Sequence, residues 1–227
     1  MEVKKKKCKG RREARGHGCG QLRYLDGFKR GLCNECFLDW CCSTDEGLQF
    51  AQKKAIKTAN EIRKEGKARR KSERIEIMSV SKYRSKIMQP VFNEIARLID
   101  QGQPCIATGN FGKMNGGHYY TQGAHPEISL NLHNIHIQSF ESNHFQSGDE
   151  RRYLQGLISV YGGPYAGKVV DLKRVYKDRV ISKREMQDTL PRAKRVRKWL
   201  RKRNHIWSAT DRVRLRSIAN QYIGLYG

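Results

Sequence analysis

Three short stretches decide how the middle of this chain folds, and they read Gly117-His118-Tyr119, Asn134-Ile135-His136-Ile137-Gln138 and Ser142-Asn143-His144. Either Ser139 or Ser142 can cap a helix that begins just after them, because serine hydroxyls accept hydrogen bonds from the first free backbone N–H groups of a helix. Asn143 is then expected in the first turn, where the positive end of the helix dipole favours phosphate.

The residues before Asn134 alternate as in a half-buried strand. Ile128, Leu130 and Leu132 share one phase, and the apolar phase then slips to Ile135 and Ile137. The pattern therefore predicts a strand that bends or bulges around His133 and Asn134.

The order histidine, asparagine, asparagine is suited to one kind of chemistry. A histidine at the end of a strand can deprotonate water, an asparagine on the return segment can hold that imidazole, and a residue on the next helix can ligate a divalent cation beside a scissile phosphate. This is the layout of a ββα-metal (His-Asn-His, HNH) nuclease site. The alternative is a small αβ element whose histidines and asparagines only satisfy buried backbone groups.

The composition favours a nucleic-acid partner. The 227 residues include 46 Lys and Arg against 22 Asp and Glu, a formal net charge of +24, which is more than solubility requires. Hydrophobic content is 37%, so several small cores joined by solvated helices are expected. No apolar run approaches the roughly 20 residues of a membrane span, and no apolar segment follows the first lysines as in a signal peptide. We therefore expect a cytoplasmic protein.

The charge is unevenly placed. Between Cys105 and Glu150 the only basic residue is Lys113, whereas residues 53–86 hold thirteen Lys and Arg against four glutamates. Residues 192–216 hold eleven against Asp211. Flanks of this kind can grip phosphates without reading sequence; the alternative is that they are solvated faces. The predicted DNA-binding residues are Arg192, Lys194, Arg195, Arg197, Lys198, Arg201, Lys202 and Arg203.

Six of the seven cysteines lie in the first 42 residues. Four of them have the spacing of a metal site, Cys8-x10-Cys19-x13-Cys33-x2-Cys36, with Gly20 as a knuckle glycine. Tetrahedral zinc with four thiolates is the simplest occupant, and it would stabilise a segment too short and polar to fold alone. His17, Cys41 and Cys42 are competing ligands, although the two later cysteines are better interpreted as small buried side chains.

The predicted fold is mainly α-helical with a small ββα-metal (HNH-like) element. Four regions follow: a zinc-binding module over 1–43, a basic helical arm over 44–80, an HNH-like nuclease domain over 81–161 and a basic C-terminal helical region over 162–227. Helix starts are predicted at Ser43 with Glu46, at Ser79 or Ser81 with a kink near Pro90, and at Ser182 and Ser208.

Residues from about Ser81 to Tyr161 resemble the NinG (Rap) family of phage recombination nucleases. The resemblance runs through Pro104-Cys105, Gly117-His118-Tyr119, Asn134-Ile135-His136 with Gln138, and Asn143 with Ser147-Gly148. It implies a structure-specific endonuclease acting on branched DNA such as Holliday junctions and D-loops. The N-terminal cysteines also resemble those of some family members.

The chain departs from the family pattern at two places. Two Cys-x-x-Cys pairs that bind zinc in the family read Cys105, Thr108, Ser139 and Ser142 here, and one cysteine cannot hold zinc. An aspartate three positions before the family's histidine is Asn115. The resemblance then leaves His118 as base, Asn134 as its orienter, and Asn143 with His136 as ligands of a weakly held Mg²⁺ or Mn²⁺.

The sequence therefore predicts a metal-dependent endonuclease that hydrolyses DNA at branches by a one-metal HNH mechanism. A homodimer would suit cleavage of both strands of a symmetric junction. The alternatives are a DNA-binding recombination protein whose site has decayed, and a packaging or scaffold protein that uses charge alone.

Overall fold

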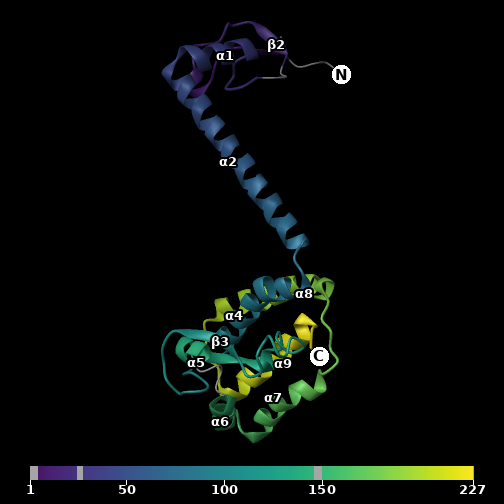
Figure 1. The fold of residues 1–227 in the computed structure, drawn as a ribbon. Coiled ribbons are helices and arrows are strands. Elements are labelled where there is room, and N and C mark those ends of the chain that lie inside the picture. The colour runs from purple at the N-terminus through teal and green to yellow at the C-terminus, as the bar shows by residue number, and fades with distance from the viewer. Residues whose placement is uncertain (1–4, 25–27, 146–149, 227) are drawn as a thin grey trace. The chain divides into compact units, whose positions relative to one another are not determined.

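The computed structural model describes residues 5–24, 28–145 and 150–226, with the side chains of 144 and 145 left aside. The protein is mainly helical, with two small antiparallel sheets of two strands each (Figure 1). It divides into two compact units, residues 1–76 and residues 77–227.

The first unit is a small cysteine-rich module continued by a long helix. Its elements are β1 (Lys5–Lys7), a 3-10 turn (Arg12–Ala14), β2 (Leu22–Tyr24), α1 (Asn34–Ser43) and α2 (Asp45–Glu76). A core of Leu32, Phe37 and Trp40 packs around the cysteines, with Phe50 of α2 against it. Thr44, not Ser43, caps α2, because its Oγ1 accepts from the Gly47 N–H at 3.0 Å and Ser43 still belongs to α1.

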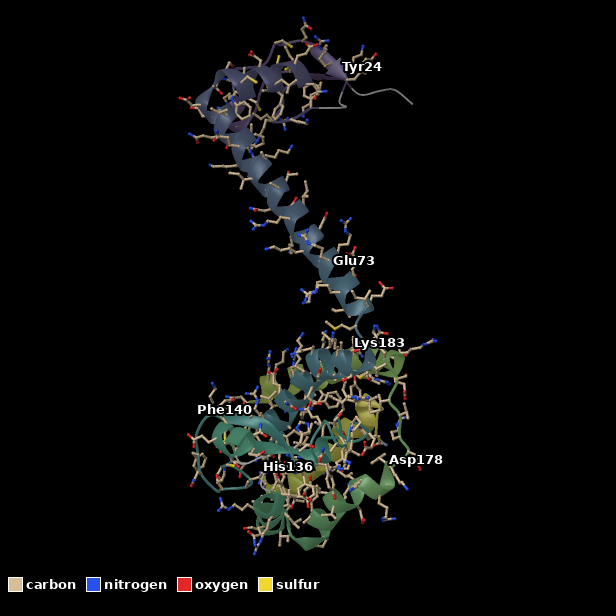
Figure 2. The ribbon with its side chains drawn as sticks, in the orientation of Figure 1. Tyr24, Glu73, His136, Phe140, Asp178 and Lys183 are labelled. Atoms are coloured by element: carbon tan, nitrogen blue, oxygen red, sulfur yellow. The ribbon has the colours of Figure 1, made fainter. Side chains whose placement is uncertain are left out.

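Helix α2 is 32 residues long, about 48 Å at 1.5 Å per residue, and is solvated over most of its length. Between Gln52 and Arg74 every residue except the half-buried Gly66 is exposed. Figure 2 shows side chains such as Glu73 projecting from the helix. The charged residues along it therefore stabilise the helix mainly through local pairs such as Arg69 with Glu73.

The second unit is a hairpin surrounded by helices. Its elements are α3 (Val80–Tyr83), a π-helical segment (Arg84–Met88), α4 (Gln89–Ile99), β3 (Met114–His118), a 3-10 turn (Leu132–Asn134), β4 (Ile135–Ser139), α5 (Phe140–Phe145), α6 (Glu150–Tyr161), α7 (Gly163–Val175), α8 (Lys183–Arg203) and α9 (Ala209–Ile223). Ser79 caps α3, and the expected kink is the π-helical segment just before Pro90. Ser182 with Glu185 forms a capping box on α8, and Ser208 caps α9, as the sequence predicts.

The strand predicted over Ile128, Leu130 and Leu132 is wrong. All three side chains are buried, but residues 121–131 are turns and loop, and the strand begins only at Ile135. Its partner is β3, Met-Asn-Gly-Gly-His, which has no apolar alternation to announce it. Burial here is achieved by a loop that packs its apolar side chains inward, so periodicity alone misassigned it.

Candidate functional site

His118 lies at the end of β3 and faces α4. The register pairs His118 with Ile135 and Gly116 with Ile137, and directly opposed residues of an antiparallel pair share one face. A Cβ on Gly116 would lie 2.8 Å from the Asn93 backbone, so this face packs directly on α4. A side chain larger than glycine at position 116 would separate the hairpin from the helix.

The imidazole of His118 is buried and uncharged. Its Nε2 is 3.1 Å from the Ser129 carbonyl and 2.7 Å from the Gln89 side-chain nitrogen. Burial lowers the pKa of His118 to about 4, and the Ser129 carbonyl only partly offsets this. When the neutral ring donates from Nε2 to that carbonyl, its lone pair lies on Nδ1, which is then the atom that could accept a proton; in the other tautomer Nε2 accepts from Gln89 and Nδ1 carries the proton.

Asn134 holds the backbone that follows His118. Its Oδ1 accepts from the Tyr120 N–H at 2.8 Å, and its Nδ2 donates to the Tyr120 carbonyl at 3.0 Å. The Asn134 carbonyl also accepts from the Tyr119 N–H at 3.0 Å. The sequence predicts direct contact between Asn134 and the imidazole; the structure instead places Asn134 as a clamp across the two ends of the loop that joins the strands.

His136 lies on the opposite face of the hairpin from His118. His136 pairs with Gly117, the residue next to His118, and neighbouring residues of a strand point to opposite faces. The ring of His136 is completely buried between α6 and α7. Nδ1 is 3.1 Å from the Tyr153 hydroxyl, and Nε2 is 3.0 Å from the Tyr165 hydroxyl. Both ring nitrogens are therefore occupied, which does not suit the predicted role of His136 as a cation ligand.

The contacts of His136 belong to a chain of hydrogen bonds whose directions can be assigned. Tyr153 donates to the Gly117 carbonyl, so its oxygen accepts from His136 Nδ1–H. Tyr165 then donates to His136 Nε2 and accepts from His133 Nδ1–H at 3.1 Å. The chain ends at His133 Nε2, which accepts from Lys168 Nζ at 3.3 Å and lies 3.1 Å from Ser217 Oγ, a hydroxyl that also contacts the Val213 carbonyl. The chain fixes the carbonyl immediately before His118.

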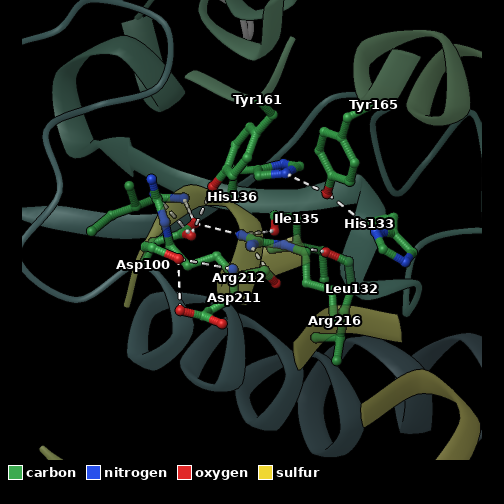
Figure 3. Close-up of polar contacts among 12 residues, drawn as sticks. Asp100, Leu132, His133, Ile135, His136, Tyr161, Tyr165, Asp211, Arg212 and Arg216 are labelled. Atoms are coloured by element: carbon green, nitrogen blue, oxygen red, sulfur yellow. Dashed lines mark hydrogen bonds and ion pairs between the residues drawn. The ribbon is translucent and has the colours of Figure 1, made fainter. Parts of the chain in front are cut away.

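A buried ion pair between Asp100 and Arg216 of α9 supports β4. Arg216 Nη2 is 2.6 Å from Asp100 Oδ2 (Figure 3). Both side chains are fully buried. The carboxylate also accepts from the Ile137 N–H at 2.9 Å and from the Tyr161 hydroxyl at 3.1 Å. Arg216 further donates to the Leu132 carbonyl at 3.1 Å. Asp100, Tyr153, Tyr161, Tyr165 and Arg216 were not predicted as site residues, since scattered single polar residues give no local pattern.

Asn143 is half-buried on α5, which Ser139 caps through the Ser142 N–H at 3.2 Å. Asn115 pairs with Gln138, on the same face as His136. Within the described residues, the hairpin contains no group of three or more His, Cys, Asp or Glu side chains that could hold an ion. The donors that remain there are neutral amides and hydroxyls, which are poor ligands for Mg²⁺.

The four positions that correspond to zinc cysteines in the resembled family still lie together. Cys105 contacts both Thr108 and Ser139, and Ser142 follows one turn later. The turn keeps its shape, since the Gly109 N–H donates to the Cys105 carbonyl at 2.8 Å and Gly109 has a φ of 72°. Burial acts to raise the pKa of the Cys105 thiol, but hydrogen bonds from Ser139 and Thr108 outweigh it and lower that pKa.

The N-terminal cysteines form the one cluster in the described residues that could hold a metal such as zinc. The sulfur atoms of Cys8, Cys19, Cys33 and Cys36 all lie within 4.8 Å of one another. Tetrahedral zinc with bonds of about 2.3 Å would place them roughly 3.8 Å apart, so the set fits after a small contraction. Gly20 has a φ of 74°, as a knuckle requires. His17, Cys41 and Cys42 lie outside the cluster; Cys41 is buried and Cys42 is exposed.

The crowded thiols have opposed acidities. A backbone hydrogen bond from Gln21 lowers the pKa of Cys19 to about 7. Burial, together with the neighbouring thiols, raises the pKa of Cys36 to about 12. Four thiolates at this separation would repel one another, and a divalent cation would relieve that repulsion.

The predicted DNA-binding residues lie on α8, which packs against α4. Glu94 of α4 pairs with Arg197 at 3.3 Å and with Arg201 Nε at 2.6 Å, so these two arginines also join the helices. Others on the helix are exposed, among them Lys194, Arg195 and Lys198. No helix in the described ranges is long and apolar enough to cross a membrane.

The comparisons with known proteins agree on one family. The family described as Bacteriophage Lambda NinG protein matches residues 4–203. The chain is 35% identical to Protein ninG of Escherichia phage lambda over 82 residues, 35% of this chain and 40% of that protein. It is 27% identical over 149 residues to Protein ninG of Escherichia phage 933W and of Enterobacteria phage VT2-Sa, 58% of this chain and 74% of each. No solved structure matches it.

Proposed function

The chain belongs to the NinG family, and from this membership and the geometry of the hairpin we propose that it is an endonuclease acting on branched DNA such as Holliday junctions and D-loops. The observation that carries the proposal is the arrangement at the end of β3. His118 is neutral, its Nε2 is fixed on the Ser129 carbonyl, and Asn134 clamps the loop that follows it.

In this proposal His118 is the general base. Its Nδ1 takes a proton from water, the resulting hydroxide attacks phosphorus, one P–O bond breaks, and the leaving oxygen takes up a proton from solvent. Asn134 positions the backbone that follows the base. The basic residues of α8 and α2 bind phosphates without reading sequence.

The residues present do not fit a tightly held catalytic cation. Both ring nitrogens of His136 are occupied, and Asn143 is a single neutral donor. If Mg²⁺ or Mn²⁺ takes part, the DNA phosphates must supply most of its ligands. Weak binding of that kind would make cleavage depend on a high metal concentration.

A second function, binding branched DNA without cutting it, is favoured by the burial of His118. Proton transfer is most efficient when the pKa of the base lies near the working pH, and that of His118 is about 4. A weak base beside a poor cation site is what a decayed nuclease would retain.

Cleavage of a four-way junction beside a linear duplex, in Mg²⁺, Mn²⁺ or EDTA, separates the two functions. For a nuclease we expect His118→Ala to lower the cleavage rate by about 10²–10⁴-fold while junction affinity stays within about twofold. His17→Ala, in the other unit, is the control. Junction binding without cutting by the unaltered protein in any metal would establish the second function.

A further inference from the structure

Two tryptophans lie together at the C-terminal end of the most basic helix. Trp199 of α8 and Trp207, which follows it, have nearly parallel rings, 16° apart with centroids at 6.2 Å. His205 packs edge-on against Trp207 at 4.5 Å. Trp199 is 41% exposed, although burying an indole is normally favourable. These three rings are called here the aromatic platform.

The turn that follows α8 holds the aromatic platform in place. Asn204 ends α8 in the left-handed conformation, with φ of 43° and ψ of 50°, which reverses the chain and returns Trp207 to Trp199. Gln101 donates from Nε2 to the Asn204 Oδ1 at 2.6 Å. Ile206 lies over Gly102, where a Cβ would come within 3.0 Å of its Cδ1. The three rings, of which Trp199 and His205 are exposed and Trp207 is half-buried, therefore occupy a defined position.

Positive charge surrounds the platform. On a helix, residues three or four positions apart share a face, which places Arg195, Lys202 and Arg203 beside Trp199. The Arg203 guanidinium lies 5.1 Å from the Trp199 ring centre. Arg197 and Arg201 pair with Glu94, whereas Arg195, Lys198 and Lys202 have no carboxylate partner among the residues described. The unpaired cations are free to bind an anionic ligand.

We propose that the aromatic platform stacks unpaired nucleobases of single-stranded DNA. Exposed aromatic rings among cations that follow a phosphate backbone are the standard means of holding single strands, because every base has a face to stack. Arginine can extend the stack. This inference rests on the proposed function only in taking DNA as the ligand; it needs no cleavage, and it assigns the platform to the unpaired strand at a branch.

The alternative occupant is a protein. An apolar groove beside Trp199 is lined by Ile99, Val196, Leu215, Ile218 and Tyr222. The cations at its edge favour DNA over an apolar protein surface. A second copy of this chain, with its charge of +24, would be repelled.

Two oligonucleotides of equal length separate stacking from charge. One is oligothymidylate, and the other is an abasic strand with the same phosphates. We expect oligothymidylate to bind the full chain roughly tenfold more tightly for each stacked base, without added metal, and to quench tryptophan fluorescence. Trp199→Ala should bring the two affinities together, and Trp199→Phe should restore part of the difference. Lys198→Gln should weaken both strands equally.

The outcomes distinguish the possible failures. Equal affinity for oligothymidylate and the abasic strand would show that the aromatic platform does not stack bases, although the protein binds DNA. Binding of neither would overturn both this inference and the DNA-binding part of the proposed function. Self-association of the unaltered chain that Trp199→Ala removes would assign the surface to a second copy instead. Circular dichroism of each variant shows whether it is folded.

Discussion

His118, His133 and His136 are buried histidines whose charged form is disfavoured. Burial lowers the pKa of His118 to about 4. Burial, with Lys168 and Arg216 nearby, lowers that of His133 to about 3. That of His136 lies well below 6.5. An unfolded chain binds these protons near pH 6.5, so between that value and about 4 the unfolded state holds more protons.

The folded state should therefore lose stability as the pH falls from about 6.5 toward 4, by up to about 1.4 kcal/mol per pH unit for each histidine. Above pH 6.5 their contribution is complete. Urea unfolding at a series of pH values measures the slope, and His133→Gln should make it shallower. A flat profile over this range would mean that the rings reach solvent.

The Asp100–Arg216 pair should be sensitive to the loss of either partner. Asp100→Asn leaves a buried guanidinium without its counter-charge, and breaking a buried pair in this way costs about 3–5 kcal/mol. Thermal or urea unfolding of the full chain measures the loss. Asp171→Asn is the matched control, since its pair with Arg174 is exposed and should contribute little. Similar effects of the two substitutions would contradict the burial of the first pair.

Among the elements, the N-terminal module depends most on its side-chain chemistry. If its four thiolates bind zinc, purified protein should contain about one zinc per chain, and Cys33→Ser should unfold the module and release the metal. Metal analysis measures the bound zinc, and circular dichroism measures the unfolding of the module. Cys42→Ser, at an exposed cysteine outside the cluster, should change neither. Two zinc ions per chain would show that the second unit also has a metal site.

The sequence predicts helices and the metal cluster better than it predicts the hairpin. Helix starts at Ser79, Ser182 and Ser208 are visible because a cap and an apolar stripe are local signals. The cysteine spacing is equally local, and the four sulfur atoms do meet. Strand β3 is not visible, because its two central glycines are selected by close approach to α4 and to Gln138, both distant in sequence.

The site shows the same limit. The sequence indicates which histidines and asparagines matter but not which face of the hairpin each occupies. His118 is opposite Ile135, and His136 is opposite Gly117, which is the neighbouring pair of residues in the hairpin. Because successive pairs point to opposite faces, the two histidines lie on opposite sides of the hairpin. Their hydrogen-bond partners, Ser129, Tyr153 and Tyr165, come from a loop and two later helices. Only the tertiary structure brings them together.

For the whole molecule, the charge on α8 can be tested without removing the helix. Deleting residues 192–227 would also remove Arg216 and Asn220, which hold the hairpin from α9. Neutralising Lys194, Arg195, Lys198 and Lys202 to glutamine preserves the fold, since all four are exposed. If each contacts a phosphate, the slope of log affinity against log salt for duplex DNA should fall by about 3–4.

Selectivity for branched over linear DNA should survive these substitutions, because point charges read phosphate density and not shape. Four matched substitutions on α2, at Lys53, Lys54, Lys57 and Lys64, serve as the comparison. If the salt slope is unchanged in the α8 variant and reduced in the α2 variant, the phosphate contacts belong to α2.

The contacts of Cys105 with Thr108 and Ser139 determine how the second unit responds to oxidants and to a shortage of zinc. The second unit holds a single cysteine, surrounded by hydroxyl groups, and its hairpin is tied by hydrogen bonds to α6, α7 and α9. Within the described residues this unit has no cysteine cluster, so neither a shortage of zinc nor thiol oxidation would remove a metal that it needs to fold. The first unit has six cysteines, four of them in one cluster, and would be the half to fail under both. Oxidative stress or metal starvation would thus strike the two halves of one chain unequally.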